Sequence, residues 1–107
     1  MSKPIHMLYL IKRKEAWYQL SDEEKDLITK QTVEATTRAG GKRLIICDAT
    51  WSSGDCEFFE VTEFPDISAA QKRIELYEQI DVFRYYEITT ILGLALAQTC
   101  HDAEQVE

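Results

Sequence analysis

A seven-residue apolar segment near the N-terminus, Ile5–Ile11 (IHMLYLI), most constrains what this chain can fold into. It is too short for an independent helix, and its residue types favour a strand. Alternation places one set of side chains on one face (His6, Leu8, Leu10) and a second set on the other (Ile5, Met7, Tyr9, Ile11). Because both faces are mainly apolar, we predict a buried central strand with a covering layer on each side.

A helical pattern follows the first strand and runs to Ala39. A short helical turn is expected around Trp17, and the segment Ser21–Glu24 matches a capping box, which predicts that a longer helix begins at about Asp22. Gly40 and Gly41 are typical of a helix end. The expected inward-facing positions are Leu20, Leu27, Ile28, Gln31 and Ala35.

The rest of the chain predicts two further strands, a second helix and a last strand. The strands cover 43–50 and 56–64, and the loop between them, which contains Trp51, predicts an antiparallel hairpin. Asp66 or Ser68 is expected to cap a helix that extends through Gln79. The inward positions of that helix are expected to be Ile67, Ala70, Ile74, Tyr77 and Ile80, and the fourth strand covers 83–91.

The resulting order, β-α-β-β-α-β, is that of the ferredoxin-like α+β sandwich. We expect one such domain over residues 1–97 and a polar, acidic tail over 98–107. Right-handed crossovers place the first and third strands in the sheet centre and both helices on one face. The other face is left apolar, so we predict a homodimer that covers it with a second copy of the sheet.

Charge and composition exclude several classes of protein. The net charge is −7, and residues 54–107 carry three Lys/Arg against twelve Asp/Glu, so no nucleic-acid partner is expected. No apolar segment reaches the roughly 18 residues that a membrane span needs, so no membrane partner is expected. Three cysteines without a CxxC pair favour a cytoplasmic location, and the scattered histidines predict no metal and no cofactor.

In topology and length, residues 5–92 resemble the dimeric α+β barrel superfamily, which includes antibiotic-biosynthesis monooxygenases and small polyketide cyclases. The segment Trp17-x-x-Leu20-Ser21-x-Glu23-Glu24 is similar to darcynin-like members, which have no assigned activity. His6 at the start of the first strand and the segment Phe59–Thr62 (FEVT) resemble the small polyketide cyclases. Those cyclases use a second histidine before the last strand, whereas this chain has none between residues 7 and 100.

The resemblance implies a cofactor-independent enzyme that acts on an aromatic or polyketide-like compound by proton abstraction leading to oxygenation, cyclisation or isomerisation. In that hypothesis His6 is the base and Tyr86 stabilises the oxyanion. The expected ligand-binding residues are Leu8, Leu10, Trp17, Trp51, Phe59 and Val61. The alternative is a homodimer without catalysis that binds a small ligand or acts as an accessory protein. His6 is then half solvated or hydrogen-bonded to a backbone carbonyl, and the aromatic residues are core or, for Trp51, dimer contacts.

Overall fold

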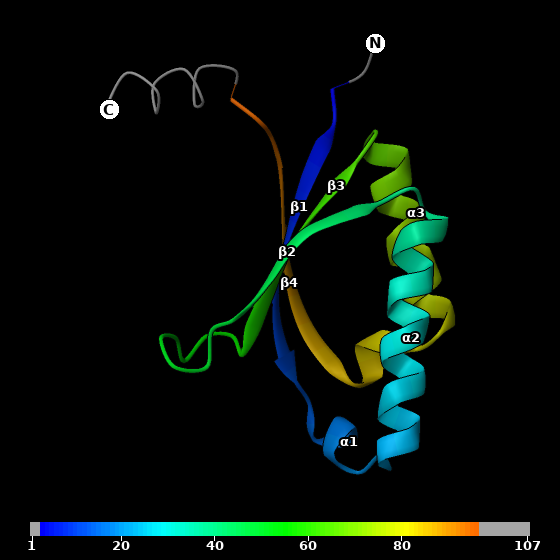
Figure 1. Cartoon of the computed structure of the whole chain (residues 1–107), viewed down its shortest axis with the longest axis vertical. Helices are drawn as coiled ribbons and strands as arrows, with labels where there is room; N and C mark the ends of the chain where they lie inside the picture. Colours follow the sequence, from blue (N-terminus) through cyan, green and yellow to red (C-terminus); the bar gives the residue numbers. More distant parts are fainter. Residues whose placement is uncertain (1–2, 97–107) are drawn as a thin grey trace.

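The computed structural model describes residues 3–96, and the elements occur in the predicted order (Figure 1). They are β1 (Ile5–Arg13), α1 (Glu15–Tyr18), α2 (Asp22–Arg38), β2 (Lys42–Asp48), β3 (Phe58–Phe64), α3 (Ile67–Gln79), the 3-10 turn η1 (Val82–Arg84) and β4 (Tyr86–Leu94). The expected tail and the domain end at residue 97 lie outside the described residues, as do one of the three cysteines, Cys100, and one of the two histidines, His101.

The four strands form one antiparallel sheet in the order β2-β3-β1-β4. The first and third strands are central, as predicted, and α2 and α3 lie together on one side of the sheet (Figure 1). This arrangement confirms the ferredoxin-like α+β fold. It also leaves the second side of the sheet without a covering helix among the described residues.

Side-chain alternation on β1 decides which residues face the helices. Met7, Tyr9 and Ile11 are buried and pack in the main core with residues of α2 and α3, so the odd-numbered positions point toward the helices. The even-numbered positions lie on the open face, where Leu8 is opposite Val61 of β3 and Ile91 of β4. On this face the neighbouring registers are His6 with Glu63 and Leu10 with Phe59.

The predicted start of α2 is confirmed. The Ser21 hydroxyl accepts a hydrogen bond from the Glu24 amide at 3.1 Å, and the Glu24 carboxylate accepts one from the Ser21 amide at 3.0 Å. The helix ends before Gly40, whose φ of 87° is one that favours glycine. The inward stripe is confirmed at Ile28 and Ala35 and is wrong at Leu27, which is 55% exposed because α2 presents a narrower apolar face than the sequence spacing indicated.

The second half of the chain differs from the prediction in several details, and β3 begins at Phe58 instead of residue 56. Val82–Arg84 forms a 3-10 turn, because Asp81 adopts a left-handed φ of 59° just before it, and β4 therefore begins only at Tyr86. Asp66, one of the two predicted caps, caps α3, and Ala70 and Tyr77 are buried. The expected inward position Ile67 is instead exposed, whereas Arg73 is buried.

Candidate functional site

A cavity of about 390 Å³ lies between the helix-facing side of the sheet and the helices. Its apolar and aromatic wall comes from Ile11, Trp17, Ile46, Phe58, Tyr77, Val82, Tyr86 and Ile88, and its polar wall includes Arg13, Thr29, Thr32, Arg43, Asp48, Glu57 and Glu60. A second hollow runs along the outside of α3, between Asp66 and Glu75. Because its lining comes from α3 and its cap alone, it has no opposite wall, and the sheet–helix cavity is the candidate site.

An aromatic cluster forms one end of this cavity. Trp17 is placed there by the single turn of α1, and its ring centroid lies 5.1 Å from that of Tyr86 at the start of β4. Phe58 meets Tyr86 edge to face, with centroids 6.1 Å apart. Such a surface can stack against a flat aromatic ligand.

The wall formed by α2 consists of two threonines, Thr29 and Thr32. The Thr29 hydroxyl donates to the Lys25 carbonyl at 2.9 Å, and the Thr32 hydroxyl donates to the Thr29 carbonyl at 2.7 Å. These hydroxyl protons are used within the helix, so the threonines offer only methyl groups and oxygen lone pairs to a ligand. Ile46 on β2 is 47% exposed although it lines the cavity, which shows that the cavity is accessible from this edge of the sheet.

An ion pair lies beside the aromatic cluster. The Glu57 carboxylate accepts hydrogen bonds from the Arg13 amide at 2.8 Å and from Arg13 Nη1 at 3.3 Å. The Arg13 guanidinium lies 4.9 Å from the Phe58 ring centroid, within the range of a cation–π contact. Both charges of the pair are therefore already compensated at this point of the wall.

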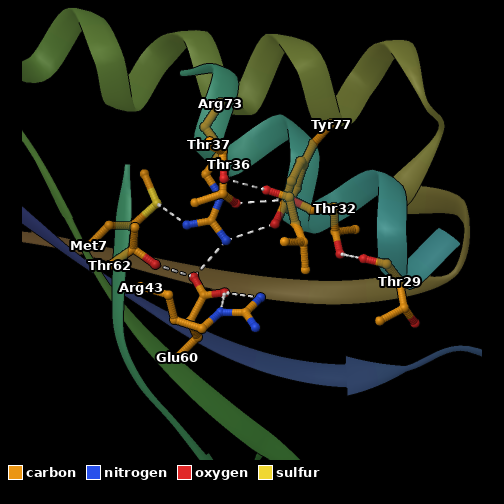
Figure 2. Close-up of polar contacts among 11 residues, drawn as sticks. Met7, Thr29, Thr32, Thr36, Thr37, Arg43, Glu60, Thr62, Arg73 and Tyr77 are labelled. Carbon is orange, nitrogen blue, oxygen red and sulfur yellow. Dashed lines mark hydrogen bonds and ion pairs between the residues drawn. The ribbon is translucent and has the colours of Figure 1, made fainter. Parts of the chain in front are cut away.

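A buried polar network adjoins the cavity, because Arg43, Glu60 and Tyr77 line it, and Figure 2 shows the contacts within this network. Arg73 Nη2 donates to Glu60 Oε1 at 2.6 Å and to the Tyr77 hydroxyl oxygen at 2.7 Å. The second oxygen of Glu60 receives Nε and Nη2 of Arg43, each at 3.1 Å. The side chain of Arg73 is 0% exposed and that of Glu60 is 2% exposed, whereas Arg43 reaches the surface.

Burial changes the ionisation of groups at and beside the cavity. Burial raises the pKa of Tyr86 to about 12, against a lowering effect of the Arg13 charge. Burial likewise raises the pKa of Tyr9 to about 12, although the Arg73 charge opposes it. For Arg73, burial opposes the charged form, but Tyr77 and Glu60 outweigh it and the pKa of the guanidinium is raised. At neutral pH these phenols are therefore protonated, and Arg73 carries its charge.

The structure brings together two of the residues singled out by the sequence, Trp17 and Tyr86. Four others lie on the open face of the sheet and not in the cavity, namely Leu8, Leu10, Phe59 and Val61. Trp51 lies in the β2–β3 loop, is 84% exposed, and donates from Nε1 to the Asp48 carbonyl at 3.2 Å.

His6 lies on the same open face, so within one chain the sheet separates it from Tyr86. Its Nε2 is 3.6 Å from Glu63 Oε1. Its Nδ1 is buried and has no hydrogen-bond partner among the described residues.

Sequence reasoning missed Arg73 and the network around it, although a signal was present. Arg73 lies three residues after Ala70 and four before Tyr77, on the inward stripe of α3. Glu60 shares the helix-facing side of β3 with Thr62 and Phe64. A cation and a carboxylate on two facing apolar surfaces predict a buried pair, since neither charge is stable alone in a core.

Over residues 3–96, no three His, Cys, Asp or Glu side chains are grouped so that they could hold a metal ion. The helices of the described region are too short or too polar to cross a membrane.

The sequence matches no protein-family model and none of the curated proteins. Its fold is similar to that of chlorite dismutase from Candidatus Nitrospira defluvii. One variant of that enzyme aligns with a TM-score of 0.73 and 18% identity over 92% of this chain. The complex of the enzyme with imidazole aligns with a TM-score of 0.72 and 20% identity over 90% of this chain. A separate structure described as a candidate chlorite dismutase aligns with a TM-score of 0.69 and 19% identity over 90%. The chain spans less than half the length of each, between 42% and 46%. At this identity the likeness establishes a shared ferredoxin-like fold.

Proposed function

We propose that this protein binds a small aromatic molecule in the cavity between the sheet and the helices. The observation that carries the proposal is the Trp17–Tyr86 pair, with centroids 5.1 Å apart, on the wall of a cavity of about 390 Å³. Small-ligand sites are mostly apolar concave surfaces with a few polar anchors, and a volume of this size is in their usual range.

Binding without catalysis is the form of the proposal that the contacts favour. Each carboxylate on the wall already has a partner within the chain: Glu57 pairs with Arg13, Glu60 pairs with Arg43 and Arg73, and Asp48 accepts hydrogen bonds from Thr50. The hydrogen bonds from Thr50 also lower the pKa of Asp48, which makes it a weaker base.

An enzyme that abstracts a proton, leading to oxygenation, cyclisation or isomerisation, is the second candidate. Tyr86 supports it, because a phenol that stays protonated at neutral pH can donate a hydrogen bond to an oxyanion. The role of His6 as the base of this reaction stays a prediction. It requires that the ligand reaches the open face of the sheet; otherwise a second chain has to bring a base to the cavity.

We also propose that the chain forms a homodimer through the open face of the sheet. Leu8, Leu10, Phe59 and Val61 form an apolar strip there, and Ile45 and Ile91 at its sides are each 52% exposed. With strands about 4.8 Å apart and about 3.4 Å per residue, the face measures roughly 500 Å² on each protomer. Two such faces bury about 1,000 Å² in total, the lower bound for a specific interface. Trp51 lies beyond this face on the β2–β3 loop and adds contact area if the loops meet.

The aromatic site can be tested by isothermal titration calorimetry with two probes, 2-naphthamide and 2-naphthoate, because both present the same bicyclic ring. We expect binding that weakens about tenfold or more in Trp17→Ala, since the stacking surface is lost. Trp51→Ala is the matched control and should bind as the wild type does. Absence of binding by both probes, or equal weakening in the two variants, would overturn the proposal.

A further inference from the structure

The inner side of the cavity carries one positive charge in excess. Glu60 is the only carboxylate in contact with both Arg43 and Arg73 among the described residues, so the cluster of three holds two cations and one anion. Arg73 is fully buried, and its raised pKa keeps it charged. The charge that Glu60 does not balance is therefore that of Arg43, which is partly exposed on the cavity wall, and a partly desolvated charge attracts a counter-charge more strongly than one in water does.

The other charged groups on the wall do not cancel this excess. Glu57 is paired with Arg13. Asp48 is held by Thr50 at the exposed edge of the cavity, where water screens its charge. The positive charge of the inner cluster is therefore the one left for a ligand to neutralise.

Three hydrogen-bond donors of this cluster have no partner among the described residues: Arg73 Nε is buried, and the other two belong to side chains that line the cavity. Arg43 binds Glu60 through Nε and Nη2, and no bond from its Nη1 is formed with the described residues. The Tyr77 hydroxyl accepts from Arg73, so its own proton is directed elsewhere, and no residue of the described part accepts it. Both side chains line the cavity, and Figure 2 shows Tyr77 in contact with Arg73 and Arg43 in contact with Glu60. A donation from Arg73 also polarises the phenol and makes it a stronger donor.

We propose that the ligand of this cavity is an aromatic monoanion, a carboxylate or a phenolate. Its negatively charged oxygen is bound by Arg43, with the Tyr77 hydroxyl as a second donor, while its ring packs against Trp17 and Tyr86. This inference rests on the proposed function, since it specifies the chemistry of the ligand for the same cavity. The whole chain has a net charge of −7, which repels anions at long range, so a preference for an anion must come from the local cluster.

The experiment compares 2-naphthoate with 2-naphthamide, which have nearly the same shape but differ in charge at neutral pH. We expect the wild type to bind the carboxylate about tenfold or more tightly than the amide, the size of effect that a charge-assisted hydrogen bond gives. Arg43→Gln should remove that preference, Arg43→Lys should keep part of it, and Tyr77→Phe should reduce it. Arg84→Gln is the control, because it changes the net charge equally on an exposed arginine outside the cavity.

The outcomes separate this inference from the proposed function. If both probes bind with equal affinity and Trp17→Ala weakens both, the aromatic site stands and the charge inference fails. If neither probe binds, both fail. Equal loss of the preference in Arg84→Gln and Arg43→Gln would also overturn the inference, because the effect would then be long-range. The wild-type comparison needs no variant, so it holds even where a substitution at Arg43 weakens the fold.

Discussion

Among the described residues, Glu60 is the counter-ion of the buried Arg73, and it also pairs with the partly exposed Arg43. Glu60→Gln leaves Arg73 charged and buried without a counter-ion, which typically costs about 3–5 kcal/mol of stability. Arg73→Met should cost less, since Glu60 keeps Arg43. Urea unfolding followed by circular dichroism measures both, with Glu63→Gln on the open side of β3 as the control. An unchanged midpoint in Glu60→Gln would contradict the pairing.

The raised pKa of Tyr86 predicts that the folded chain loses stability at alkaline pH. Its pKa is about 12 in the folded chain, against about 10 for an exposed phenol. Between these values the unfolded chain releases the proton and the folded chain retains it, so the stability that is fully present below pH 10 falls as pH rises toward 12. Tyr86 contributes up to about 1.4 kcal/mol per pH unit to the slope of the unfolding free energy against pH. Unfolding free energies measured across this window should fall less steeply in Tyr86→Phe; equal slopes would disprove the assignment.

At the scale of elements, the N-terminal cap of α2 is a separable source of stability. The reciprocal bonds between Ser21 and Glu24 satisfy two amides of the first turn. Ser21→Ala should therefore reduce the free energy of unfolding by about 1 kcal/mol. Ser68→Ala is the matched control, because Asp66 and not Ser68 caps α3. Thermal unfolding of the two variants measures the difference, and equal midpoints would show that the cap contributes nothing.

The elements also show how far the sequence predicts this molecule. Strand and helix order, the central place of β1 and β3, and both helix caps follow from local patterns, since alternation and capping depend on neighbouring residues. The residues that line the candidate site cannot be predicted from local patterns in the same way. The two faces of β1 are about equally apolar, so the sequence does not say which one the helices cover, and that choice separates Leu8 and Leu10 from Trp17. The position of Arg73 opposite Glu60 depends on packing between α3 and β3, which local patterns do not describe.

At the scale of the whole molecule, the open face of the sheet is the surface through which we expect two chains to associate. The helices form one layer and the sheet the other, so a second copy is the simplest cover for the apolar strip around Leu8 (Figure 1). We expect the wild type to sediment at twice the chain mass of 12.4 kDa.

Leu8→Asp tests this assembly, because it places a charge between Val61 and Ile91 in the centre of the strip, where a second sheet would have to desolvate it. The variant should sediment as a monomer. Leu27→Asp makes the same chemical change on the exposed surface of α2 and should remain a dimer. Sedimentation velocity over a range of concentrations, with circular dichroism to confirm that both variants are folded, gives the answer. A wild type that stays monomeric at every concentration would disprove the dimer, and it would leave the cavity, which one chain forms by itself, as the only proposed site.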